Sequence, residues 1–120
     1  MPTFWKQGLI WNKPTKNKKE PNPEDKAWTA FSDLIRLRDC LATIGSDKAG
    51  RCVTCKTIIA RKGNDAGHFV SRGATVIKYH PQNCHLQCTT CNRFQQGKWA
   101  EYMDFVESEY GREVADNLRA

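Results

Sequence analysis

Apolar residues recur at steps of three and four between positions 23 and 44, which predicts one long helix. Asn22 can cap its first turn, Pro23 suits the first helical position, and Gly45 suits the left-handed residue after its end. We assign the apolar positions to a single stripe made of Trp28, Phe31, Leu34, Ile35, Leu37, Leu41 and Ile44. A second helical pattern between residues 98 and 119, interrupted by Gly111, predicts C-terminal helices.

Between these helices the pattern changes to short β-prone runs. Residues 57–60, 66–70 and 83–87 are separated by polar or glycine-containing turns, so we expect short strands there. A helix is expected to follow from Cys88 to about Gln96, with Gly97 at its end. Helices on both sides of a strand-rich centre predict an α+β fold.

The first 21 residues differ from the rest. They combine prolines and clustered lysines with no apolar period, so we expect a basic, partly disordered arm. We expect residues 22–120 to form a single domain. Its parts would be a helix at 23–44, a central core at 50–97 and C-terminal helices at 98–119.

Two Cys-x-x-Cys pairs enclose the strand-rich centre. Cys52 and Cys55 form the first pair, Cys88 and Cys91 the second, with 32 residues between the pairs. Four thiolates at this spacing can hold one structural zinc ion, whose binding energy then contributes to folding. Cys40 and Cys84 belong to neither pair, and we expect them in the core. A small disulfide-stapled secreted domain is the alternative interpretation of six cysteines.

The charge distribution favours an anionic partner. Residues 1–100 contain 17 Lys or Arg against 7 Asp or Glu, whereas residues 101–120 contain 2 against 6. A basic body attracts nucleic acid, although the same charge could serve solubility alone. No apolar run is long enough to cross a membrane and no signal-peptide pattern is visible, so we expect a cytoplasmic protein.

Two segments together resemble the HNH (ββα-metal) nucleases. They are Asp65-Ala-Gly-His68-Phe and Asn83-Cys-His85-Leu-Gln-Cys88-Thr-Thr-Cys91-Asn92. The chain is most similar to the lambdoid phage NinG, or Rap, recombination proteins, which cut branched DNA. The similarity extends from residue 27, through the Ile35-Arg-Leu-Arg-Asp39 segment, to about Tyr110.

The resemblance implies a zinc-stabilised ββα-metal core flanked by N-terminal and C-terminal helices. It also implies a metal-dependent DNA endonuclease that acts on branched or junction DNA in phage recombination, in the host cytoplasm if the chain is phage-encoded. Whether the chain forms a homodimer, or acts with phage or host recombination proteins, stays open.

The same resemblance assigns roles to individual residues. His68 matches the general base that deprotonates the attacking water. Asn83 matches the residue whose side chain ties the intervening loop to the strand and so holds His68. Asn92 matches a ligand of the catalytic Mg²⁺, or Mn²⁺, which stabilises the developing charge. Zinc cannot take this role, because four thiolates close its coordination sphere.

One position departs from the family pattern. Many members have an acidic or histidine metal ligand directly before the general base, where this chain has Gly67. Asp65 and His85 are the two candidates for the second Mg²⁺ ligand. Asp65 should point to the strand face opposite His68, and His85 should share its face with Asn83.

Two other functions remain open. The four cysteines could stabilise a nucleic-acid-binding module without catalysis, or the same fold could serve a sequence-specific HNH nuclease. A binding module has no need for a general base beside a hard-metal ligand. No separate sequence-reading domain is visible, which disfavours the sequence-specific nuclease.

Overall fold

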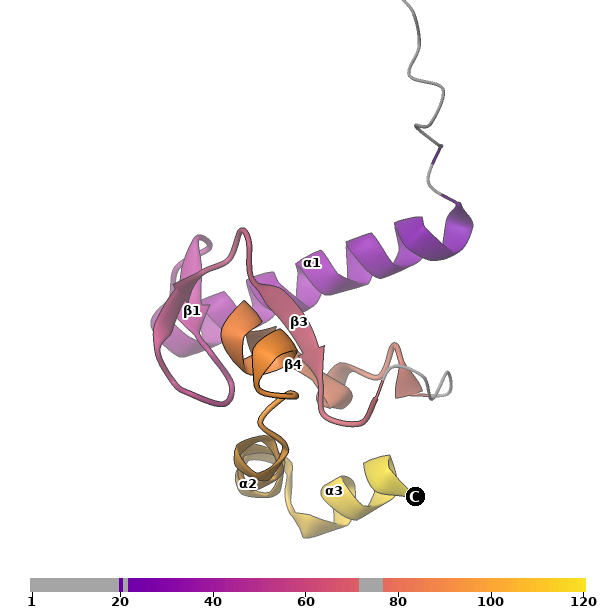
Figure 1. Ribbon diagram of the computed structural model, residues 1–120, viewed down its shortest axis with the longest axis vertical. Helices are drawn as coiled ribbons and strands as arrows, with labels where there is room; N and C mark the ends of the chain where they lie inside the picture. Colours follow the sequence, from indigo (N-terminus) through magenta and orange to yellow (C-terminus); the bar gives the residue numbers. More distant parts are fainter. Residues whose placement is uncertain (1–19, 21, 72–76) are drawn as a thin grey trace, which may run out of the picture.

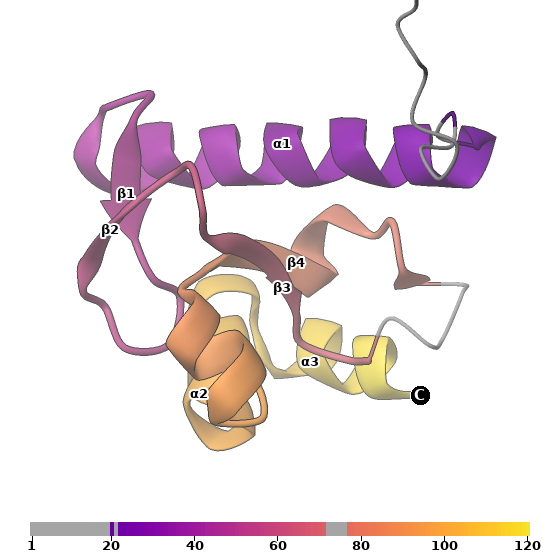
Figure 2. The ribbon, with the colours of Figure 1, turned by 45° about the horizontal axis from the view of Figure 1, so that its top comes forward.

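The computed structural model describes residues 20, 22–71 and 77–120. The predicted arm at residues 1–21 therefore lies, except for Glu20, outside the described residues. Helix α1 (Pro23–Ile44) lies on one side of the antiparallel strands β3 (Asp65–His68) and β4 (Cys84–Gln87). Helices α2 (Trp99–Tyr110) and α3 (Arg112–Arg119) lie on the other side (Figures 1 and 2). The chain thus has the mixed α+β fold that its sequence predicts.

A second antiparallel pair surrounds the first cysteine pair. Strand β1 (Ala49–Arg51) pairs with β2 (Ile58–Ala60), near the C-terminal end of α1 in Figure 2. Two short helical turns complete the centre, η2 (Pro81–Asn83) before β4 and the π-helical turn η3 (Thr90–Phe94) after it. No helix among residues 22–71 and 77–120 is long and apolar enough to cross a membrane.

Both ends of α1 lie where the capping residues predict them. The Asn22 side chain accepts a hydrogen bond from the Asp25 backbone N–H at 2.7 Å. Gly45 adopts a left-handed φ of 75° and donates its N–H to the Leu41 carbonyl at 3.1 Å. Local chemistry alone therefore fixes the length of this helix.

The prediction of a single apolar stripe on α1 was wrong. Ile35 is only 2% exposed and faces the strands, whereas Leu34 is 62% exposed and Leu41 is 51% exposed. Consecutive helical residues differ in direction by about 100°, so the series through Leu34 lies on another face than the series through Ile35. Only the series through Ile35 is covered by the strands.

The strands are shorter than predicted, and their register decides which side chains share a face. In the β3–β4 pair, Asp65 lies opposite Gln87, Gly67 opposite His85 and His68 opposite Cys84. Directly opposed residues of an antiparallel pair point to the same side, and neighbours alternate. His68 and Cys84 therefore face α1, whereas Asp65, Gly67, His85 and Gln87 belong to the opposite face.

The helix predicted after Cys88 is limited to η3. Gly97, at its expected end, has a φ of 79° and donates its N–H to the Cys91 carbonyl at 2.8 Å. A π-helical turn is wider than an α-helical one and is common at functional sites.

Two small hydrophobic cores lie on the two sides of β3–β4. The first, toward α1, contains Ile35, Ala66 and Cys84, with Trp28 and Phe31 packed against it. The second, toward α2 and α3, consists of Val53, Phe69, Tyr102, Val106, Ala115 and Leu118. Because each cluster is small, hydrophobic burial alone gives this chain limited stability.

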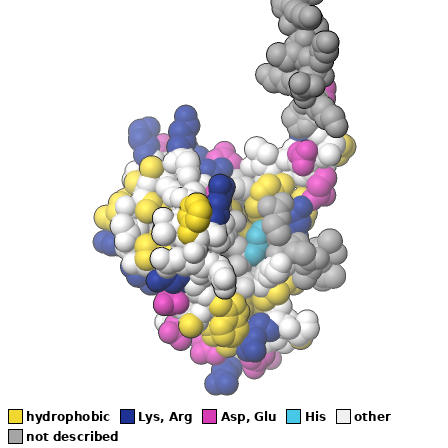
Figure 3. Space-filling view, viewed as in Figure 1, with side chains coloured by type: hydrophobic (Ala, Val, Ile, Leu, Met, Phe, Trp, Pro, Cys, Tyr) yellow, Lys and Arg dark blue, Asp and Glu magenta, His cyan; other side chains and the backbone are white. Residues whose placement is uncertain are grey.

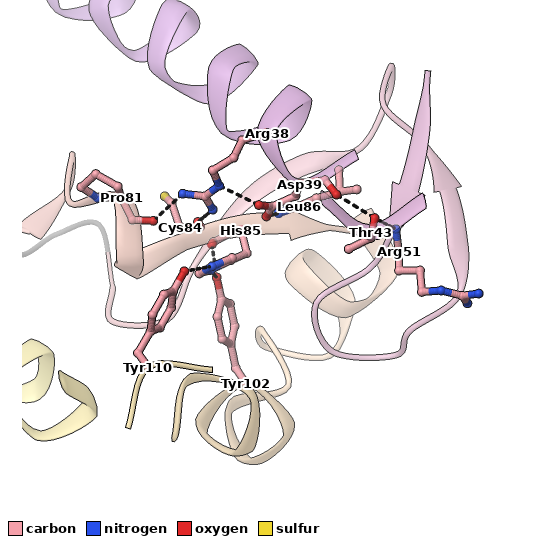
Figure 4. A network of polar contacts seen from close by, with 11 residues as sticks. Arg38, Asp39, Thr43, Arg51, Pro81, Cys84, His85, Leu86, Tyr102 and Tyr110 are labelled. Atoms are coloured by element: carbon pink, nitrogen blue, oxygen red, sulfur yellow. Dashed lines mark hydrogen bonds and ion pairs between the residues drawn. The ribbon is translucent and has the colours of Figure 1, made fainter. Parts of the chain in front are cut away.

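Side chains from α1 hold β4 in place (Figure 4). The Asp39 carboxylate accepts a hydrogen bond from the Leu86 N–H at 2.8 Å. Arg38 donates to the Pro81 carbonyl at 2.9 Å and to the Cys84 carbonyl at 2.8 Å. This strand lies directly between Asn83 and Cys88, so these contacts also help to position both residues.

We expect Gly50→Ala to destabilise the fold by about 1–3 kcal/mol, in the range of overpacked cores. A Cβ at this position would lie 2.7 Å from the Cys40 Cα and 3.0 Å from Leu86 Cδ2, so α1 would have to move away from β1. Urea unfolding of zinc-loaded protein measures the change. Lys62→Ala, in an exposed turn, is the control and should stay within about 0.5 kcal/mol of the parent. Equal stability of the two variants would contradict the tight α1–β1 contact.

Candidate functional site

The four paired cysteines converge on one point. The sulfur atoms of Cys52, Cys55, Cys88 and Cys91 all lie within 4.8 Å of one another, and those of Cys55 and Cys88 are 3.9 Å apart. A tetrahedral site with zinc–sulfur bonds of about 2.3 Å has sulfur–sulfur edges of about 3.8 Å. None of the six cysteines forms a disulfide, and Cys40 and Cys84 lie outside this group. The arrangement fits a structural metal such as zinc.

Backbone hydrogen bonds prepare these sulfurs for a cation. Cys52 Sγ accepts N–H bonds from Cys55 at 3.5 Å and from Cys88 at 3.4 Å. Burial opposes ionisation of Cys52, but these donors and the Thr54 hydroxyl outweigh it and lower the pKa to about 6. Burial raises the pKa of Cys91 to about 12. All four groups can therefore be thiolates together only if a bound cation compensates their charge.

The ring of His68 is held on two sides. Its Nε2 lies 3.0 Å from the Lys78 carbonyl oxygen, and its ring stacks on Trp28 with centroids 5.1 Å apart. A carbonyl can only accept, so Nε2 carries the proton, and in the neutral ring the lone pair is at Nδ1. The sequence did not indicate this role of Trp28, because its spacing also fits the apolar stripe of α1.

Asn83 closes the connection between Val70 and Ile77. Its buried side chain accepts from the Val70 N–H at 2.9 Å and donates to the carbonyls of Val70 at 3.1 Å and Ile77 at 3.3 Å. Ile77 directly precedes Lys78, whose carbonyl contacts His68. The Asn83 side chain thus fixes the segment that orients the His68 ring. Arg72, which is within this connection, lies outside the described residues.

Asn92 lines both the cavity that contains His68 and the cavity that contains Asp65. His68 and Asn92 line one cavity of about 410 Å³, and Asn92 and Asp65 line a neighbouring cavity of about 310 Å³. The Asn92 Nδ2 donates to Asp65 Oδ2 at 2.9 Å. Arg93 also contacts this carboxylate, with an Nη2–Oδ1 distance of 3.0 Å.

His85 lies elsewhere, so the structure does not bring it to Asn92. It is 3% exposed and packs against α2, with Nδ1 3.3 Å from the Tyr102 hydroxyl and Nε2 2.8 Å from the Tyr110 hydroxyl (Figure 4). Tyr102 in turn donates to the Gly67 carbonyl at 2.7 Å. Both ring nitrogens therefore have protein partners. Burial lowers the pKa of His85 to about 4, so the ring is neutral at pH 7.

The contact between Gly67 and Gln87 explains why no acid precedes His68. A Cβ at position 67 would lie 2.0 Å from Gln87 Oε1, so the Gln87 side chain fills that space. Gln87 is fully buried and its Nε2 donates to Thr54 Oγ1 at 3.1 Å and to the Gly97 carbonyl at 3.0 Å. Asp65 lies on the same strand face as Gly67, two residues earlier. The only sequence signal for Gln87 was a polar residue directly before Cys88.

Charged side chains are unevenly distributed on the face shown in Figure 3. Lysine and arginine side chains lie along the upper and left margins, and both acidic and basic side chains lie near the bottom, over α2 and α3.

One protein-family model matches most of the chain. The model described as "Bacteriophage Lambda NinG protein" matches residues 9–120. The chain belongs to the NinG family. The match includes both cysteine pairs, together with His68 and Asn92.

Individual NinG relatives match over a shorter stretch. The chain is 29% identical to the protein ninG of Escherichia phage lambda over 70 residues, which is 58% of this chain and 34% of the relative. The shares are the same for ninG of Escherichia phage 933W, at 27% identity, and of Salmonella phage P22, at 26%. The match thus covers about a third of the length of these curated relatives. Among solved structures, none matches the chain.

We expect one zinc ion per chain in protein purified without added metal, measured by elemental analysis. Cys88→Ser should lose the zinc and most of its stability, because one thiolate and its backbone hydrogen bond disappear. Cys40→Ser and Cys84→Ser are the matched controls and should keep the zinc, since both lie outside the sulfur cluster. Folded parent protein without zinc, or zinc lost from either control, would show that this metal centre is misassigned.

We expect stability to fall as the pH drops from 6.5 to about 4, in part because of His85. The pKa of His85 lies below its ordinary value of 6.5, so the unfolded chain binds a proton that the folded chain excludes. The stabilisation is full above pH 6.5 and is lost through this window, by on the order of 3 kcal/mol. Urea unfolding at several pH values, with zinc present, measures it.

His85→Gln is the control for this titration, because an amide does not ionise between these pH values. The zinc thiolates contribute equally to the acid sensitivity of both proteins, so the difference between the two profiles isolates the imidazole. Parallel profiles for parent and variant would contradict a neutral, buried His85.

Proposed function

We propose that this NinG-family chain is a metal-dependent DNA endonuclease of the HNH, or ββα-metal, type. The observation that supports it best is the shared cavity of His68 and Asn92, with the imidazole ring fixed by the Lys78 carbonyl. Strands β3 and β4 are followed by η3, with one cysteine pair before β3 and the other after β4. This order agrees with the ββα core that the resemblance implies.

His68 is the general base in this proposal. Its Nε2–H is engaged with Lys78, so the Nδ1 lone pair accepts the proton of the water that attacks the phosphorus. Imidazole suits this step, because it gains and loses a proton near neutral pH. Trp28 and Lys78 orient the ring, and Asn83 acts as a positioning residue because it fixes the connection that contains Lys78.

Asn92 and Asp65 would hold the catalytic Mg²⁺ or Mn²⁺. Both ions prefer carboxylate and carbonyl oxygens, and these two side chains offer one of each in direct contact. Bound there, the ion would stabilise negative charge at the scissile phosphate and the leaving oxygen. The proposal assigns the second ligand to Asp65 rather than His85, because Asp65 contacts Asn92, whereas both ring nitrogens of His85 contact tyrosine hydroxyls.

Branched DNA in phage recombination, with phage or host recombination proteins as partners in the host cytoplasm, is the substrate and setting that the resemblance implies. The excess of basic residues in positions 1–100 supports a polyanionic substrate.

We expect His68→Ala to reduce cleavage about 10²–10⁴-fold, because it removes the proton acceptor. Added Mg²⁺ should not restore the rate, since the metal ligands are intact. Asp65→Ala and Asn92→Ala should have defects that shrink as Mg²⁺ rises or when Mn²⁺ replaces it. The measurement is a metal titration of cleavage rate on a four-way junction, a fork and a matched duplex.

His80→Ala is the matched histidine control. The His80 ring accepts a hydrogen bond from the Gln82 N–H at 3.2 Å at the start of η2, outside both site cavities, so its removal should leave the rate unchanged. If His68→Ala cuts at the parental rate, the proposed mechanism fails. If the parent binds DNA but cuts none of the three substrates, the chain is a zinc-stabilised binding module.

A further inference from the structure

Arg93 forms an ion pair with the Asp65 carboxylate, which the proposed metal site needs as a ligand. Its Nε lies 3.1 Å from Asp65 Oδ2 and its Nη2 lies 3.0 Å from Oδ1, so the guanidinium binds both oxygens. Asn92 donates to Oδ2 as well, at 2.9 Å. Asp65 therefore accepts three hydrogen bonds, two of them from a permanent cation.

A divalent cation and this guanidinium compete for the same oxygens. A carboxylate has about four lone-pair sites, and three hydrogen bonds leave little room for a metal ion with its water shell. Like charges at contact distance also repel. Asn92 creates no such conflict, because its amide is neutral and the same side chain presents a carbonyl oxygen.

Arg93 can leave without disturbing the fold. Its side chain is 63% exposed, whereas that of Asp65 is 14% exposed. Within residues 22–71 and 77–120 it donates hydrogen bonds to Asp65 alone. Arg36 lines the same cavity but differs, because it donates to the Asp33 carboxylate and to the Ser32 and Arg61 carbonyls.

We propose that Arg93 is the displaceable counter-ion of this site. It holds Asp65 in the metal-free protein, is released when a divalent cation binds, and then pairs with a phosphate of the DNA. A guanidinium fits both partners, since carboxylate and phosphate each accept a bidentate pair of hydrogen bonds. This inference rests on the proposed function, and it makes metal binding and DNA binding mutually favourable.

The first test is Mn²⁺ affinity without DNA, measured on zinc-loaded protein by electron paramagnetic resonance of free Mn²⁺. Arg93→Ala should bind Mn²⁺ roughly three- to tenfold more tightly, because the competing ion pair is gone. Arg112→Ala is the matched control: it removes the same charge from an exposed side chain on α3 and should leave Mn²⁺ affinity unchanged. Asp65→Asn should abolish Mn²⁺ binding.

The second test is affinity for a four-way junction in a His68→Ala background, with and without Mn²⁺. Mn²⁺ should raise the affinity, and the increase should be smaller when Arg93 is also replaced by alanine, because no guanidinium is then released to the phosphate. An equal increase with and without Arg93 would overturn the transfer to DNA.

The outcomes separate the two proposals. If the parent binds no Mn²⁺, or if Asp65→Asn binds it as the parent does, the proposed metal site fails and the inference fails with it. If Asp65→Asn loses Mn²⁺ while Arg93→Ala binds it no more tightly than Arg112→Ala, the metal site stands and the role of Arg93 is overturned.

Discussion

Four sulfur atoms that could hold one metal ion supplement the two small hydrophobic cores of this chain. Cys52 and Cys55 come before β3, and Cys88 and Cys91 come after β4, so one metal ion would join the two ends of the central segment. The two hydrophobic clusters on either side of β3 and β4 are small. Metal binding would therefore contribute directly to the folding of the segment that contains the candidate site.

The sulfur cluster also sets the geometry of the site, because Cys91 directly precedes Asn92. A metal that holds Cys91 fixes the start of the π-helical turn, and with it the amide that contacts Asp65 on β3. On the other side of the site, the position of His68 depends on hydrogen bonds to backbone carbonyls, through Lys78 and the Asn83 side chain. One half of the site would thus be held by metal–thiolate bonds, whereas the other half is held by amide hydrogen bonds.

Local features were predictable from sequence, and pairings across the fold were not. The ends of α1 followed from Asn22 and Gly45, and the sulfur cluster followed from cysteine spacing, because each depends on neighbouring residues or on a fixed ligand geometry. The buried face of α1 was not predictable, since both series of apolar residues fit a helical period and only the strands select one.

The sequence also did not show whether Asp65 or His85 lies beside Asn92. Alternation along one strand gives relative directions, but the register of β3 against β4 and the docking of α2 decide which residue meets Asn92 and which is buried by tyrosines. The tight fit of the Gln87 side chain over the Gly67 backbone also depends on how the two strands are paired.

The contacts of Arg38 and Asp39 have a consequence for the outer edge of the sheet. Strand β4 pairs with β3 along one edge, and its other edge would normally expose N–H and carbonyl groups to any extended peptide. Here the Asp39 carboxylate accepts the Leu86 N–H, the Val53 N–H donates to the Leu86 carbonyl at 2.8 Å, and Arg38 satisfies the Cys84 carbonyl. The Arg38 and Asp39 side chains and the Val53 amide thus take the hydrogen-bonding positions that a third strand would occupy. The two-stranded sheet is closed at this edge, and loss of either charged residue would create a surface prone to intermolecular strand addition.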